Sequence, residues 1–324
     1  MQSQLTGARA HPPEPRDRFR GCLLGLAVGD ALDAPFETLE AADIFARFGL
    51  PDAILATAAT GPLRYTDDTE MAINLAESLV EVGEIQGDAL MRAFAANFDP
   101  LRGYGGGAIR IIGAARNGGD WRATSETVYP GGSFGNGAAM RVAPVGLLFH
   151  DDPDKVWEQA RLSARVTHRH PLGVEGARLL ALAVAQAVSA EEIDRKVFLQ
   201  TLLDRAETEE FRWALRTARK MKRGDSVAPL GNGVAAHQSV VTAIACFLAT
   251  PPAFDLAVGR AIGLGGDTDT LAAMTGALCG AFGGTGVIPA KLLDRLEVGP
   301  KGRGCIIEMA DKLFDRFTQR SGLT

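Results

Sequence analysis

Two acidic clusters stand about 200 residues apart in the chain, and each combines two aspartates with threonine hydroxyls. The first spans residues 66–69 (Thr-Asp-Asp-Thr) and the second spans residues 265–270 (Gly-Gly-Asp-Thr-Asp-Thr). If the fold brings them together, each pair of like charges about 4 Å apart repels by roughly 1–4 kcal/mol, depending on the effective dielectric constant. A bound cation relieves that repulsion, and carboxylate and hydroxyl oxygens suit hard ions such as Mg²⁺, Mn²⁺ or Ca²⁺. The two clusters therefore predict a two-metal centre with oxygen ligands.

The same residues also have a purely structural interpretation. Asp and Thr before an apolar run are common helix N-caps, and acids in a first turn complement the helix dipole. Asp67 and Glu70 have the three-residue spacing of a capping box. For one cluster alone, capping is the simpler interpretation. Two near-identical clusters, together with the motifs below, favour metal binding.

Four further segments carry candidate binding residues. Residues 25–37 end a helical pattern and contain three acids, Asp30, Asp33 and Glu37. These acids are either binding residues or simply solvated side chains where the helix ends. Residues 102–107 (Arg-Gly-Tyr-Gly-Gly-Gly) offer glycine amides that can hold a phosphate, although a flexible surface loop is the simpler interpretation of this segment alone.

The third segment, residues 129–141, is a glycine-rich loop that we expect to open a helix, so that its amides and the helix dipole can hold a diphosphate. Ser133 and Asn136 can add hydrogen bonds, and Phe134 either stacks on a base or packs in a tight turn. The fourth segment contains Thr167, His168 and His170. No third soft ligand is near these histidines, so we expect His168 to contact substrate or order a loop rather than bind zinc.

Helical periodicity dominates the elements that must position these residues. Apolar side chains recur with helical spacing in residues 19–27, 71–82, 173–188, 235–248, 254–264, 271–282 and 306–317. Alternating strand patterns are scarce along the chain. No linker divides the chain. We therefore expect a flexible tail over residues 1–16 and one compact all-α domain over residues 17–324, in which the two acidic clusters meet.

Bulk composition narrows the functional classes. The 324 residues are 46% hydrophobic and 23% charged, as in ordinary soluble globular proteins. The net charge of −5 predicts no general attraction to nucleic acid or to an anionic membrane. Four widely spaced cysteines without a Cys-x-x-Cys pair predict neither a zinc site nor disulfides, and they favour a cytoplasmic setting. We expect no signal peptide and no membrane span.

In this order, the motifs G-D-A-x-x-x-P-F-E, Y-T-D-D-T, G-N-G-x-x-M-R, T-H and G-G-D-T-D-T resemble those of the ADP-ribosylglycohydrolase family. The resemblance covers about residues 17–285. It implies an all-α fold with two Mg²⁺ (or Mn²⁺) ions in a central cleft. It also implies hydrolysis of the N- or O-glycosidic bond at the ribose distal to adenine.

Matching motif to motif carries the family's site onto this chain. One metal is implied for Thr66, Asp67 and Asp68, and the other for Asp267, Asp269 and Thr270, with Asp269 as the bridge. Glu37 matches the mobile acid that ligates metal or transfers a proton, so the catalytic residues are Glu37, Asp68 and Asp267. The resemblance assigns the ADP-ribose contacts to Tyr104, Gly105, Gly106, Gly107, Gly132, Ser133, Phe134, Gly135, Asn136, Met140 and His168.

Three alternatives stay open at this point. One is a metal-dependent nucleotide phosphohydrolase, which also needs clustered acids and a phosphate loop. Another is a catalytically silent, crystallin-like member of the ADP-ribosylglycohydrolase family, which needs neither feature. Within the family, residues 102–107 and 133–137 look closer to the branch that cleaves serine-linked and other O-linked ADP-ribose than to the arginine branch. We therefore expect a monomeric enzyme whose partner is an ADP-ribosylated protein or a small ADP-ribose conjugate, rather than nucleic acid or a membrane.

Overall fold

A computed structural model describes residues 12–32, 36, 39–57, 61–222, 224–251 and 253–322. Most of the predicted tail lies outside these residues, and Glu37 and Asp33 lie outside them as well. The first helix begins at Pro15, slightly before the domain start expected at residue 17.

Within the described residues the chain is helical, and pairing of β type is limited to isolated bridges. The prediction of an all-α fold is therefore confirmed. The helices of the first half are α1 (Pro15–Ala31), α2 (Ala41–Phe48), α3 (Pro51–Thr57), α4 (Asp67–Val82), α5 (Gly87–Asn97), α6 (Gly106–Arg116), α7 (Trp121–Thr127), α8 (Ala143–Leu148) and α9 (Pro153–Ala164). Those of the second half are α10 (Pro171–Ser189), α11 (Arg195–Arg205), α12 (Glu209–Lys220), α13 (Ala236–Ala249), α14 (Phe254–Ile262), α15 (Thr268–Gly283), α16 (Ala290–Leu293) and α17 (Arg303–Ser321). Four 3-10 helices connect them: η1 (Pro100–Arg102), η2 (Asn136–Ala138), η3 (Ala228–Leu230) and η4 (Thr285–Val287).

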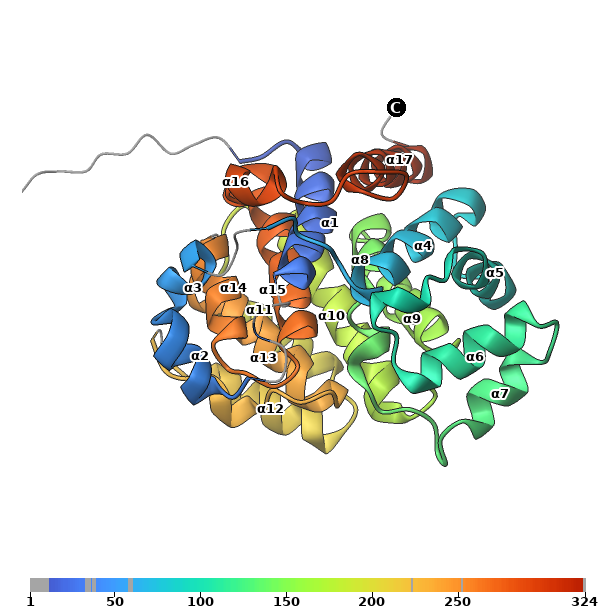
Figure 1. Ribbon diagram of the computed structural model, residues 1–324, viewed down its shortest axis with the longest axis horizontal. Helices are drawn as coiled ribbons and strands as arrows, with labels where there is room; N and C mark the ends of the chain where they lie inside the picture. Colours follow the sequence, from blue (N-terminus) through green and yellow to red (C-terminus); the bar gives the residue numbers. More distant parts are fainter. Residues whose placement is uncertain are drawn as a thin grey trace, which may run out of the picture.

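Helices α1, α10 and α15 occupy the middle of the molecule (Figure 1). Helices α2, α3 and α11 to α14 lie on one side of them, and α4 to α9 lie on the other. Helix α10 is apolar and long enough to cross a membrane by length and composition, but 72% of its apolar window is buried inside the protein. It packs against α8, α9, α13 and α15, as expected for the core helix of a globular domain.

Glycines set the distance between α1 and α15, which pack along each other in opposite directions. A methyl group at Gly25 would overlap the Gly276 carbonyl, and one at Gly280 would overlap the Gly21 carbonyl. Because these positions have no side chain, the two backbones lie in direct contact. The contact places the end of α1, with Asp30, beside the start of α15, with the second acidic cluster.

Candidate active site

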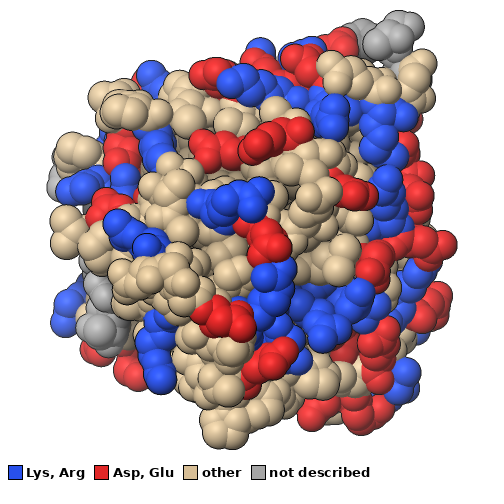
Figure 2. Space-filling view, turned by 90° about the vertical axis from the view of Figure 1, so that its right-hand side faces the viewer, with Lys and Arg blue, Asp and Glu red and all other residues tan. Residues whose placement is uncertain are grey.

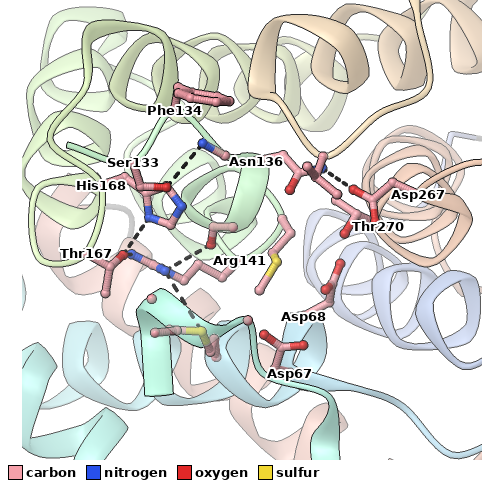
Figure 3. A pocket seen from close by; sticks show the side chains of 18 of the residues that line it. Asp67, Asp68, Ser133, Phe134, Asn136, Arg141, Thr167, His168, Asp267 and Thr270 are labelled. Atoms are coloured by element: carbon pink, nitrogen blue, oxygen red, sulfur yellow. Dashed lines mark hydrogen bonds between the residues drawn. The ribbon is translucent and has the colours of Figure 1, made fainter. Parts of the chain in front are cut away.

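A pocket of about 630 Å³ opens where the two sides of the molecule meet, and its volume suits a small-molecule ligand (Figure 3). Both acidic clusters and both glycine-rich segments contribute to its wall. The lining residues are Asp67, Asp68, Met71, Gly103, Gly105, Gly107, Ala108, Tyr129, Pro130, Gly132, Ser133, Phe134, Gly135, Asn136, Gly137, Met140, Arg141, Thr167, His168, Val234, Asp267, Asp269 and Thr270. The fold therefore brings together two segments about 200 residues apart in sequence, as the sequence predicts.

Helix starts position the acids on one wall. Asp67 and Asp68 are the first residues of α4, and the N-cap Thr66 accepts a hydrogen bond from the backbone N–H of Asp68. Asp267 is the residue before α15, and Asp269 lies in its first turn. Capping and binding are thus compatible in the first cluster, where Thr66 caps α4 while Asp67 and Asp68 line the pocket, whereas Asp267 forms no side-chain cap on α15.

Asp30 holds the first cluster in place, a role that the sequence did not reveal. Its buried carboxylate accepts hydrogen bonds from the backbone N–H groups of Thr66 and Thr69 at 3.0 Å and from the Thr69 hydroxyl at 2.5 Å. Burial raises the pKa of Asp30 to about 7, although the hydrogen bonds from Thr69 and Thr66 oppose the shift. An acid within the apolar pattern of α1 was the available signal.

Burial and mutual repulsion both act on the carboxylates of α4. Burial, followed by the charges of Asp30 and Asp269, raises the pKa of Asp67 to about 8. The same causes raise the pKa of Asp68 well above its ordinary value. Within the described part of the chain, Asp68 Oδ1 is buried without a hydrogen-bond partner. Such an atom is costly unless something else satisfies it.

The donor atoms on this wall fit a divalent cation that prefers oxygen. The carboxylates of Asp67, Asp68, Asp267 and Asp269 and the Thr270 hydroxyl are all oxygen ligands of the kind that Mg²⁺ and Mn²⁺ accept. Among the described residues, however, no three Asp, Glu, His or Cys side chains already converge on one point. The wall therefore supplies suitable ligands but not a closed shell, and the predicted ligand Glu37 lies outside the described residues.

Two asparagines form hydrogen bonds with Asp267, and one of them, Asn136, connects it to the glycine-rich loop. The backbone N–H of Asp267 donates to the Asn232 carbonyl at 2.9 Å, and the Asp267 carboxylate accepts a short hydrogen bond from the Asn136 amide. Gly266 has φ of 75° and packs so closely on Asn232 that a Cβ would overlap it. Asn232 was not predicted, because nothing in a single sequence pairs it with the Gly265–Gly266 turn.

The glycine-rich loop of residues 129–137 forms the opposite wall. Phe134 is 51% exposed at the pocket, with its ring edge-on to His170 at 5.8 Å between centroids. The expectation that this loop opens a helix is wrong in form: residues 136–138 make one 3-10 turn, and α8 begins only at Ala143. The Asn136 side chain, at the start of this turn, donates hydrogen bonds to Asp267 and Ser239. The pocket is therefore lined by irregular backbone of this loop and not by the N-terminus of a long helix.

The other glycine segment approaches the site differently from what the resemblance implies. Gly105 and Gly107 line the pocket, whereas Tyr104, Gly106 and Thr66 do not appear among its described lining residues. Tyr104 is buried, and its hydroxyl donates to Glu70 Oε2 at 2.6 Å. Glu70 also accepts from the backbone of Asp99 at 3.1 Å, so it anchors this loop instead of completing a capping box. The predicted Tyr104 contact with ADP-ribose is not what this geometry shows.

His168 and Met140 line the floor of the pocket with Arg141. Burial, with the nearby charge of Arg141, lowers the pKa of His168 to about 3. The imidazole is therefore neutral at physiological pH and can act as a hydrogen-bond donor or acceptor. Arg141, named in the sequence only as part of a motif, is the buried cation next to it.

Comparison with known proteins identifies this arrangement. The family model described as ADP-ribosylglycohydrolase matches residues 11–322. This chain belongs to the ADP-ribosylglycohydrolase family. As a member, it is a glycohydrolase enzyme, and the resemblance drawn from its motifs is confirmed.

Relatives in the family align along most of this glycohydrolase. ADP-ribosylhydrolase ARH3 of Mus musculus is 36% identical over 84% of this chain and 85% of its own length. ARH3 of Homo sapiens is 35% identical over 84% and 87%, and ARH3 of Gallus gallus is 33% identical over 97% and 96%. A solved structure called an ADP-ribosylglycohydrolase-related protein complex superposes with a TM-score of 0.67, at 27% identity over 94% of this chain and 99% of that chain.

Removing the exposed aromatic tests the wall of this glycohydrolase opposite the acids. Phe134→Ala is expected to weaken ADP-ribose binding by about 1–3 kcal/mol if adenine stacks on the ring, a magnitude taken from base stacking on aromatic residues. Isothermal titration calorimetry with ADP-ribose measures the loss. Trp213→Ala is a matched control, because Trp213 is 53% exposed and lies on α12 outside the described lining. Unchanged affinity in Phe134→Ala would assign Phe134 to packing alone.

Proposed function

We propose that this protein is a metal-dependent hydrolase that releases ADP-ribose from modified protein side chains, with a preference for serine-type O-linkages. One observation carries the proposal. A single pocket has an oxygen-rich acidic wall, formed by the starts of α4 and α15, opposite a glycine-rich loop that presents an exposed Phe134. A ligand with a sugar at one end, a diphosphate in the middle and a base at the other fits this pocket, with the sugar at the acidic wall, the diphosphate at the loop and the base at Phe134.

The acidic wall is suited to two divalent ions. We propose Thr66, Asp67 and Asp68 for one ion and Asp267, Asp269 and Thr270 for the other, with Glu37 available to either. The unpartnered Oδ1 of Asp68 and the raised pKa of Asp67 support this assignment, since a cation compensates both. When bound, Mg²⁺ or Mn²⁺ supplies Lewis acidity at the distal ribose hydroxyls and lowers the pKa of a bound water.

The chain's own residues bind and orient the substrate. Residues 132–135 line the pocket, and we propose that this loop holds the diphosphate, which places the scissile bond against the acids. The hydrogen bond from Asn136 to Asp267 fixes the loop relative to the acidic wall. A carboxylate of Glu37, Asp68 or Asp267 then acts as the general acid or base that transfers the proton, while the sugar passes through an oxocarbenium-like state.

The partner we propose is an ADP-ribosylated protein or a small ADP-ribose conjugate. Similarity to proteins named ADP-ribosylhydrolase supports it. Lys and Arg are interspersed with Asp and Glu on the face in Figure 2, which does not favour nucleic acid. We further propose a monomer in the cytoplasm, a setting that the four free cysteines favour.

Serine-linked ADP-ribose is expected to be released faster than arginine-linked ADP-ribose. A planar guanidinium calls for an acidic or aromatic rim. Among the described lining residues, the carboxylates are those assigned to the metals, and the aromatic rings of Tyr129 and Phe134 belong to the glycine-rich loop proposed for the other end of the ligand. The test incubates the protein and Mg²⁺ with two peptides of one sequence that differ only in the modified residue, and quantifies free ADP-ribose. Turnover of the arginine peptide alone would reverse the linkage assignment and leave the glycohydrolase in place. Production of a mononucleotide instead of ADP-ribose would contradict the proposed reaction.

A further inference from the structure

Three buried polar side chains form a chain of hydrogen bonds behind the glycine-rich wall (Figure 3). Arg141 Nη2 donates to Thr167 Oγ1 at 2.8 Å, and Thr167 Oγ1 lies 2.8 Å from His168 Nδ1. The three residues are only 1%, 2% and 9% exposed, respectively. At this burial each proton needs a partner, so the direction of each bond can be worked out.

The guanidinium fixes that direction. Arginine has donors only, so Thr167 Oγ1 accepts from it. The hydroxyl must then donate its own proton, and among the described residues His168 Nδ1 is the acceptor within hydrogen-bond distance. If Nδ1 carried a proton instead, the buried hydroxyl proton would be left without an acceptor. His168 Nδ1 is therefore the acceptor, and the neutral ring carries its proton on Nε2.

Nε2 faces the pocket across two glycines. A Cβ at Gly135 would lie 3.5 Å from Nε2, and one at Gly137 would lie 3.3 Å from it. Among the described residues, no side chain or carbonyl forms a hydrogen bond with Nε2. The absence of side chains at these two positions leaves the N–H uncovered on the pocket side.

Several contacts hold Arg141 in place at one end of this series of hydrogen bonds. Its Nη1 donates to the Gly137 carbonyl at 2.9 Å, its Nη2 also donates to the Ser163 carbonyl at 3.2 Å, and its guanidinium lies 5.1 Å from the centroid of the Phe94 ring. In the described part of the chain it forms no ion pair with a carboxylate. Burial lowers its pKa to about 10, which still leaves it charged at neutral pH.

We propose that Arg141 is a positioning residue that acts through Thr167 to hold neutral His168 as an Nε2–H donor to an oxygen atom of bound ADP-ribose. The identity of the ligand rests on the proposed function, whereas the proton arrangement rests on the protein alone. A neutral donor of fixed direction lets the pocket bind a phosphate or ribose oxygen without protonating the histidine.

Long-range ¹H–¹⁵N correlation spectra of the ring nitrogens test the arrangement directly in the folded protein. His168 is identified among the five histidines as the signal lost in His168→Gln. The wild type is expected to show a protonated Nε2 and an unprotonated Nδ1. In Thr167→Val, which removes the hydroxyl at nearly constant volume, the ring should shift to mixed tautomers. The dissociation constant for ADP-ribose should rise in inverse proportion to the remaining Nε2–H fraction, about twofold if half of the rings keep that tautomer. Thr167→Ser should restore both.

Gly137→Ala provides a second, independent variant. Its methyl would cover the donor edge of His168 without touching Thr167, so the tautomer should stay as in the wild type while ADP-ribose binding weakens. A wild-type ring protonated on Nδ1 would overturn the proposal, and so would a Thr167→Val protein with wild-type tautomer and affinity. If the wild-type ring is protonated on Nε2 but ADP-ribose does not bind, the ligand assignment of the proposed function fails, and with it the donor role.

Discussion

Asp68→Asn is expected to stabilise the metal-free protein while it lowers the rate of ADP-ribose release by at least about 100-fold, the upper range for loss of a residue that only supports a metal ligand. The carboxylate of Asp68 is fully buried, one oxygen has no partner among the described residues, and burial and like charges raise its pKa. Replacing the carboxyl by a neutral amide removes an acid that cannot ionise without cost. The free energy of unfolding should rise by about 1–4 kcal/mol, the repulsion between two like charges about 4 Å apart that the neutral amide no longer contributes.

Thermal unfolding in EDTA and turnover in Mg²⁺ measure the two effects on the same preparation. Asp204→Asn is the matched control, because Asp204 is exposed on α11 and its hydrogen bond to Gln200 survives the change. Both properties should be unchanged in the control. Full activity in Asp68→Asn would remove Asp68 from the catalytic machinery, and a loss of both stability and activity would show that its role is structural.

Removal of divalent ions is expected to abolish activity, and Mg²⁺ or Mn²⁺ should restore it. The stability change should depend on pH in a defined direction. Asp30 and Asp67 have pKa values raised to about 7 and about 8 by burial, above the value near 4 of an unfolded aspartate. The folded metal-free protein therefore holds more protons than the unfolded chain between about pH 4 and pH 8. Its stability is greatest at the acid end of that window and falls as the pH rises.

Metal binding should oppose that loss. A cation needs ionised carboxylates, so its affinity and its stabilising effect grow as the pH rises. The difference in melting temperature between metal-loaded and metal-free samples should therefore be larger at pH 8 than at pH 5. At a metal concentration 100 times the dissociation constant, binding to one site adds about 2.7 kcal/mol. Full activity in a sample shown by elemental analysis to be metal-free would contradict the two-metal assignment.

The helices of this fold could be predicted because their signal is local. Apolar spacing over residues 71–82 and 271–282 corresponds to α4 and α15, and the alanine-rich run of residues 173–188 is the buried core helix α10. The meeting of the two acidic clusters could also be predicted, because their composition made sense only if they shared a site. Their assignment as metal ligands remains a prediction.

The remaining features depend on contacts between distant segments. Asp30 looks like an acid at a helix exit until the fold brings Thr66 and Thr69 to it. Tyr104 lies in a segment with the composition of a phosphate loop, but Glu70 captures its hydroxyl. The segment after Phe134 forms only a 3-10 turn, and its Asn136 donates to Asp267, 131 residues further along the chain. None of these three partners is encoded by the spacing of residues along the chain.

The contact between α1 and α15 has a consequence for how enzymes of this architecture can diversify. Where two helices are separated by side chains, a change of residue size moves them apart or together by small steps. Here the spacing at Gly25 and Gly276 is set by backbone against backbone, which leaves no such adjustment. The distance between the acid at the end of α1 and the acids at the start of α15 is thus fixed, and substitutions between the helices cannot change it in small steps. New substrate preferences must instead arise in the loops of residues 103–107 and 129–137, which can vary while the reacting end stays constant.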